Sequence, residues 1–373
     1  MIFLSLVIPC LIRNLVATAM QGLGHRGTSP IIRFGEDVTS VFKYRSDKTL
    51  SRDLDGLKDS YFWAATRDKL NDPFEGMYEG DRLDFEINAI NSMVKQDTKG
   101  GVDFDDVKKS IEDILLFVDK SGIFSLSTSP FEELLWSHYA NSHSGYCVKY
   151  NLEKLIQFEN KRREKIVVKY ENRPSSYTLA DFLGAKDVSL VLQKLLGIKS
   201  KSWTYESEVR LICDPSGKHE YDYRAVEAIY FGIRAEDSSK RKVMETLAGR
   251  GVQYFEIKLI NSAYKLIAEP IADVFLGSPK YNYQISEIED GAINLNFLKP
   301  EQLKFSAYLI KAAEIVRRDP YCEKVIYADF SSSKGTVENP VIYVTYENKQ
   351  DQPINKFLTT NQIDNDYALI TDL

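Results

Sequence analysis

Apolar and polar residues alternate in several short runs of the chain, a pattern that is typical of half-buried strands. From such runs, and from short runs that are mostly apolar or aromatic, we expect strands at residues 41–45, 61–65, 122–130, 146–150, 165–170, 225–232 and 252–258. Elsewhere apolar residues recur three and four positions apart, which indicates amphipathic helices. These are expected at residues 50–60, 132–140, 152–163, 180–198 and 238–250, with a further pair between 81 and 118. Because helices and strands follow no regular alternation, we predict the α+β class, with a mixed or mainly antiparallel sheet and inserted helices.

The same pattern divides the chain into three parts. An apolar N-terminal segment and linker would cover residues 1–30, a main α+β domain residues 31–275, and a small α+β module residues 276–373. The module is expected to contain a helix at 300–318 and strands at 325–330 and 341–346. It would serve association with a partner or with a second copy of the chain.

Residues 1–20 are mostly apolar, but Arg13 and Asn14 interrupt them, so the stretch is too short and too broken for a membrane span. Ala17 and Ala19 have the spacing of an export cleavage site, yet the basic residues that begin an export signal are missing. We expect a helix packed on the domain, or a start codon placed too far upstream. Export or membrane contact through residues 1–20 is the alternative.

Composition limits the function. A chain of 373 residues, 43% of them hydrophobic, can bury a large core, and its net charge of -6 opposes a general electrostatic grip on nucleic acid. The four cysteines are far apart and lack the spacing of metal ligands. We therefore expect reduced thiols, no disulfide and no metal, in a cytoplasmic protein.

The run from Trp203 to Cys213 carries the most suggestive chemistry. If it is a strand, alternation places Glu206, Glu208 and Arg210 on one face. Two acids and a guanidinium on one face form either part of a functional site or a cluster in which Arg210 neutralises both acids.

Five short motifs carry a resemblance to a known family. They are Phe-Lys-Tyr-Arg at 42–45, Asn-Asp-Pro-Phe-Glu at 71–75, Phe-Ser-Leu-Ser-Thr-Ser at 124–129, Trp-Ser-His-Tyr-Ala at 136–140, and Trp-Thr-Tyr-Glu-Ser-Glu-Val-Arg at 203–210. Together they resemble a bacterial family known as the domain of unknown function twenty-nine seventy-one, over about residues 41–270. This resemblance names no reaction.

A more distant resemblance implies one. A strand arginine, a Ser-Thr-Ser strand and a late Glu-x-Glu strand are similar to the pattern of ADP-ribosyltransferases, which hold NAD in a split α+β fold. The resemblance implies that Arg45 clamps NAD, that Ser127 and Ser129 orient its ribose, that Glu208 accepts from a ribose hydroxyl, and that Glu206 activates the acceptor. It further implies contacts to NAD from Tyr44, Thr128, His138 and Arg210. The acceptor is unknown, and toxins, effectors and defence proteins are often organised in this way.

Two other classes stay open. One is a non-catalytic module that binds a nucleotide or a partner. The other is a metal-dependent hydrolase or nuclease that uses Asp72, Glu75, His138 and Glu208. The transferase predicts that Arg45, Ser127 and Glu208 meet in one cleft, whereas the hydrolase predicts that Asp72, Glu75 and His138 meet.

Overall fold

The computed structural model describes residues 38–79, 85–86, 88–89, 104–159, 161–178, 181 and 188–370. The predicted N-terminal segment at residues 1–30, with its possible export signal and Cys10, lies outside them. No helix among the described residues is long and apolar enough to cross a membrane.

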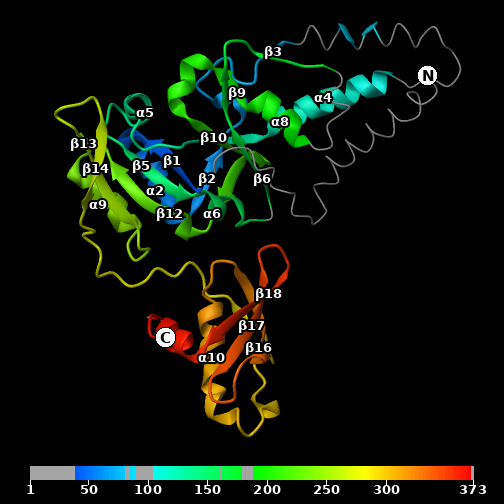
Figure 1. Cartoon of the computed structure of the whole chain (residues 1–373), viewed down its shortest axis with the longest axis vertical. Helices are drawn as coiled ribbons and strands as arrows, with labels where there is room; N and C mark the ends of the chain where they lie inside the picture. The colour runs from blue at the N-terminus through cyan, green and yellow to red at the C-terminus, as the bar shows by residue number, and fades with distance from the viewer. Residues whose placement is uncertain are drawn as a thin grey trace, which may run out of the picture. The chain divides into compact units, whose positions relative to one another are not determined.

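The largest sheet has eight strands in the order β14-β13-β12-β5-β1-β4-β10-β6 (Figure 1). Their bounds are Ser40–Arg45 (β1), Gly122–Ser127 (β4), Tyr146–Asn151 (β5), Arg162–Val167 (β6), Glu208–Asp214 (β10), Val226–Phe231 (β12), Gln253–Leu259 (β13) and Leu266–Ile271 (β14). Strands β12 and β13 pair in parallel, whereas β4 with β10, β10 with β6, and β13 with β14 are antiparallel. The sheet is therefore mixed, and the α+β prediction is confirmed.

The chain forms two compact units. The described part of the first unit comprises residues 38–43, 63–79, 85–86, 88–89, 104–135, 161–178, 181 and 188–218, and that of the second comprises 44–62, 136–159 and 219–370. The described helices of the first unit are α4 (Phe104–Lys120) and α8 (Val188–Leu196). Those of the second unit are α2 (Leu50–Lys58), α6 (Leu152–Ile156), α9 (Asp237–Thr246), α10 (Ser306–Val316) and α11 (Thr360–Tyr367). Helix α5 (Glu133–Tyr139) spans the boundary between the units. The expected division at residue 275 stays a prediction.

Two elements differ from the expectation. The helix predicted at 152–163 ends at Ile156, and β6 begins already at Arg162. Residues 162–165 are charged and suit a helix locally, but they pair in register with β10, so tertiary pairing overrides propensity. The strand predicted from Trp203 begins only at Glu208, because residues 201–206 form a 3-10 helix and Ser207 has a φ of 43°. Glu206 and Glu208 therefore do not share a strand face.

Close backbone approach requires glycine at the end of the turn that follows α5. Asn141, Ser142 and His143 in this turn all have positive φ, and Gly145 is the last residue before β5. A Cβ atom on Gly145 would lie 2.0 Å from the carbonyl oxygen of Arg45, and one on Gly232 would lie 2.1 Å from that of His143. Neither position can hold another residue without a backbone shift.

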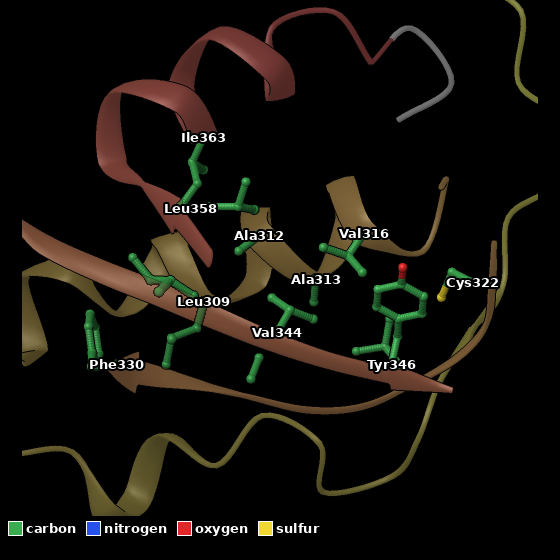
Figure 2. Packing of buried hydrophobic residues seen from close by; sticks show 13 residues of the cluster. Leu309, Ala312, Ala313, Val316, Cys322, Phe330, Val344, Tyr346, Leu358 and Ile363 are labelled. Carbon is green, nitrogen blue, oxygen red and sulfur yellow. The ribbon is translucent and has the colours of Figure 1, made fainter. Parts of the chain in front are cut away.

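The C-terminal part of the second unit has its own four-stranded sheet, in the order β15-β16-β17-β18. The strands are Glu287–Ile288 (β15), Cys322–Gly335 (β16), Pro340–Asn348 (β17) and Pro353–Thr359 (β18). Helix α10 presents Leu309, Ala312 and Val316 to Val344 and its neighbours on the sheet (Figure 2). The expected helix and two strands are confirmed, while β15, β18 and α11 were not predicted.

Candidate functional site

A buried group of charged side chains lies in the first unit, around strand β10. We call Glu75, Lys199, Glu206, Glu208 and Arg210 the charge cluster. Arg210 is fully buried. Its Nε donates to Glu208 Oε1 at 2.8 Å and its Nη2 to Glu208 Oε2 at 3.0 Å. The same guanidinium forms a two-pronged ion pair with Glu75, in which Nη2 lies 2.8 Å from Oε2. One guanidinium thus holds two carboxylates in the fork geometry that gives strong ion pairs.

Lys199 joins the third acid to this arrangement. Its ammonium group donates to Glu206 and, at 3.1 Å, to Glu208 Oε2. It also lies 4.8 Å from the centroid of the Trp203 ring, a cation–π distance. The backbone N–H of Glu208 donates to the hydroxyl of Tyr170 at 2.8 Å. Glu206 and Glu208 therefore meet through a lysine, although they do not share a strand face.

The electrostatics favour the ionised forms. Burial alone would raise the pKa of Glu208, but the charge and hydrogen bonds of Arg210, with the charge of Lys199, lower it to about 2. Burial would lower the pKa of Arg210, but Glu208 and Glu75 hold it above its usual value. Both groups are charged at neutral pH. Because Glu208 accepts from Arg210 twice and from Lys199 once, little of its acceptor capacity is left for a substrate.

The predicted hydroxyl ribbon lies beside this cluster. Ser127 is the register partner of Glu208, and Ser125 is that of Arg210, so their side chains share a face of the antiparallel pair. Both predicted serines serve the turn that follows β4, because Ser127 Oγ accepts from the N–H of Ser129 and Ser129 Oγ from that of Phe131. The backbone N–H of Thr128 donates to the carbonyl of Ser207 at 3.1 Å.

A pocket of about 460 Å³ opens next to the cluster, in the loop that carries the Asn-Asp-Pro-Phe-Glu motif. It is lined by Arg67, Asp68, Leu70, Asp72, Pro73, Glu75, Gly76 and Met77. Glu75 belongs to both the pocket wall and the charge cluster, so the pair with Arg210 fixes that wall. Arg67, also in the lining, donates to the carbonyl of Gly76 at 3.1 Å and pairs with Asp119 at 2.7 Å.

The remaining predicted residues belong to the second unit. Arg45 lies 3.7 Å from Asp53, and its side chain projects from the face of β1 opposite to Tyr44 by strand alternation. Tyr44 is buried edge-to-face against Trp136, with ring centroids 5.2 Å apart. His138 is exposed near the end of α5, with Tyr139 beside it. The structure thus brings together Glu206, Glu208 and Arg210 beside Ser127, and describes Arg45, Tyr44 and His138 in a separate unit.

The acids of the hydrolase hypothesis have structural partners. Asp72 Oδ1 caps the turn by accepting from the N–H of Phe74 at 3.0 Å, and Glu75 is held by Arg210. Within the ranges that the structure describes, no group of three or more His, Cys, Asp and Glu side chains could hold a metal ion. Cys147, Cys213 and Cys322 are buried free thiols.

One comparison with known proteins gave a match. Residues 135–211 match the model of a family described as protein of unknown function (DUF2971), about a fifth of the chain. The matched segment contains four members of the charge cluster, but not Glu75. No curated protein and no solved structure shows significant similarity to the chain.

Sequence reasoning missed three members of the site. Lys199 precedes the predicted strand in a run of Lys and Ser, and nothing local marks it as a partner for two acids. Tyr170 and Ser125 were assigned only to strands. The available signal was the strand alternation that places Glu208 and Arg210 on one face, and it indicated that other side chains would have to pair with these charges.

Proposed function

We propose that this protein is a binding module that holds a small polar ligand in the pocket at residues 67–77 without transforming it. The observation that carries the proposal is the saturation of Glu208. A carboxylate held by Arg210 and Lys199, with its pKa lowered to about 2, is a poor general base at neutral pH, since its conjugate acid is too strong. A pocket wall braced by such a cluster is preorganised for binding.

The lining indicates the charge of the ligand. The lining carries the carboxylates of Asp68, Asp72 and Glu75 and the guanidinium of Arg67; Glu75 is paired with Arg210, Asp68 with Lys69 at 3.0 Å and Arg67 with Asp119, so the charge left to a ligand is that of Asp72. Asp72 is buried, and it has no cation partner in the described part of the chain. A cationic group such as an amine or guanidinium complements this lining, whereas a phosphate would be repelled. Leu70, Pro73 and Met77 provide apolar contacts for a short carbon chain.

Calorimetric titration of the full chain with agmatine, a short molecule that bears an amine and a guanidinium, tests the proposal. We expect saturable binding that weakens at least tenfold in Asp72→Asn, because a charge-assisted hydrogen bond contributes about 1.5–3 kcal/mol. Asparagine keeps an oxygen for the N–H of Phe74, so the loop stays capped. The matched control is Glu171→Gln, an exposed acid that does not line the pocket. Equal affinity in Asp72→Asn and wild type, or no saturation, would refute this assignment.

An ADP-ribosyltransferase is a second candidate, and one observation favours it. Ser127 and Glu208 lie opposite each other on neighbouring strands, as expected if a hydroxyl and an acid act on one ribose. For catalysis a substrate hydroxyl would have to take the place of Lys199 or Arg210 on Glu208. NAD would then be a co-substrate, with the acceptor still open.

Incubation with NAD separates the two candidates. The binding module predicts no release of nicotinamide above the uncatalysed rate, with or without a cell extract as the source of acceptor. Release by the wild type that disappears in both Ser127→Ala and Glu208→Gln would establish the transferase instead. The Ser127→Ala variant is needed as well, because Glu208→Gln also removes a partner of the buried Arg210, and a loss of nicotinamide release in that variant alone could reflect a disturbed fold.

A further inference from the structure

The C-terminal sheet has a second face that α10 does not cover. Along β17, buried Ile342 and Val344 alternate with the half-buried Tyr343, so Tyr343 projects away from the core that α10 completes. Tyr327 on β16 and Phe357 on β18 flank it, and they are 41% and 38% exposed. The ring centroids lie 5.8 Å apart for Tyr327 and Tyr343, and 6.0 Å apart for Tyr343 and Phe357. We call these three rings the aromatic face.

Three aromatic rings on successive strands form more than a scattered set of exposed apolar residues. Tyr343 and Phe357 are register partners, and Tyr327 lies opposite Thr345, one outward position along β17 from Tyr343. The rings therefore form a row across the sheet, and a single extended ligand could contact all of them.

A cation already lies on this face. Lys334, at the end of β16, places its ammonium nitrogen 3.4 Å from the centroid of Phe357. The face of an aromatic ring carries partial negative charge and attracts cations. The contact shows that the geometry of Phe357 accepts an ammonium group, and the two tyrosines beside it have the same chemistry.

The surrounding charge also favours a cation. Asp329 is the register partner of Tyr343, and it accepts from the hydroxyl of Tyr327 at 3.0 Å. Residues 287–370 contain 13 Asp and Glu against nine Lys and Arg. Bases of single-stranded nucleic acid stack on such rings too, but their phosphates need a basic groove, which an acidic module does not supply.

We propose that the aromatic face binds an extended basic peptide segment, with Lys or Arg side chains stacked on Tyr327, Tyr343 and Phe357. Asp329 pairs with one of these cations, and Lys334 competes for Phe357. This partner is distinct from the small ligand of the pocket at residues 67–77.

The test is fluorescence anisotropy of a labelled decapeptide of alternating Arg and Ser, titrated with the full chain. Its control is the same peptide with citrulline in place of Arg, which keeps the shape and removes the charge. We expect the Arg peptide to bind at least tenfold more tightly than the citrulline peptide. Tyr343→Leu, which keeps an apolar side chain but removes the ring, is expected to weaken binding of the Arg peptide at least fivefold.

Lys334→Gln gives a readout that a folding defect cannot imitate, because it should tighten binding severalfold by freeing Phe357. Lys304→Gln makes the same change of charge next to Phe305, outside the aromatic face, and should leave the affinity within twofold of wild type. Equal effects of the two lysine variants would reduce the result to general attraction by an acidic protein and overturn the proposal. Tighter binding of a single-stranded oligonucleotide, or self-association that Tyr343→Leu abolishes without any peptide binding, would also overturn it.

Discussion

Replacing Arg210 with methionine should destabilise the first unit more than almost any other single change. Arg210 has no exposed surface, and its guanidinium neutralises Glu75 and Glu208, whose side chains are each only 3% exposed. Methionine has a similar length but no charge, so Glu75 would lose its cation partner and Glu208 would keep only the ammonium of Lys199, which it shares with Glu206. Removal of one partner from a buried ion pair costs about 3–5 kcal/mol.

The pKa of Glu208 sets the pH range of this effect. It falls from the ordinary value of 4.5 to about 2, and each tenfold change in acidity corresponds to about 1.4 kcal/mol. The ionised form of Glu208 is therefore stabilised by about 3 kcal/mol on folding, a net effect in which Arg210 and Lys199 outweigh burial. Because the folded pKa lies below the unfolded one, this stabilisation is present above pH 4.5 and is lost as the pH falls toward 2. The difference in the free energy of unfolding between the wild type and Arg210→Met should therefore shrink as the pH falls from 4.5 toward 2.

Urea unfolding at pH 7 and at pH 3, followed by tryptophan fluorescence and by circular dichroism, measures both effects. Arg173→Met, at an exposed arginine of the same unit, is the matched control and should change the free energy of unfolding by less than about 0.5 kcal/mol. Adding Glu75→Gln and Glu208→Gln to Arg210→Met should recover part of the loss, because no buried charge then lacks a partner. A loss below about 1 kcal/mol for Arg210→Met at pH 7 would refute the reasoning.

Four further substitutions test the packing and one hydrogen bond. Gly145→Ala should reduce the yield of folded protein sharply, whereas Gly251→Ala, which has a φ of 72° but no atom within 4 Å of the new Cβ, should cost only about 1 kcal/mol, as thermal unfolding would show. Leu309→Ala should cost about 2–5 kcal/mol in urea unfolding, because Leu309 is buried against the C-terminal sheet. Tyr170→Phe leaves the N–H of Glu208 without its acceptor and should cost about 1–3 kcal/mol, and faster exchange of that amide hydrogen would identify the cause.

Local patterns in the sequence were enough for most of the fold. The alternation at residues 41–45 predicted β1, the mostly apolar run at 146–150 predicted β5, and the helical spacing after Gly101 predicted α4. The failures came where pairing with a distant strand decides the conformation. Residues 162 and 163 are charged and were predicted to end a helix, but they lie in register with β10, about 50 positions later in the chain. No local window contains that partner.

The site shows the same division between local and distant information. Alternation placed Glu208 and Arg210 on one face, and the structure bears this out. The ammonium group of Lys199, a residue outside the predicted strand, donates a hydrogen bond to Glu206. Glu75 is 135 residues away from Arg210, and only the folded chain shows that it completes the arginine fork. A sequence can therefore show that a strand carries several charged side chains. The partners of those side chains, which the folded chain shows, decide whether an acid is available for a reaction or is held in ion pairs.

Glu75 links ligand binding in the pocket to the stability of the charge cluster, because it lines the pocket and its carboxylate is paired with Arg210. A ligand that binds only the folded protein raises its stability by about 2.7 kcal/mol at a concentration one hundred times its dissociation constant. Arg210→Met should therefore weaken agmatine binding as well as stability, since the wall would lose its brace. Asp72→Asn should weaken binding alone, because it leaves the charge cluster intact. If both variants lost stability equally, Asp72 would be part of the structural network, and the pocket would have no acid of its own with which to hold a ligand.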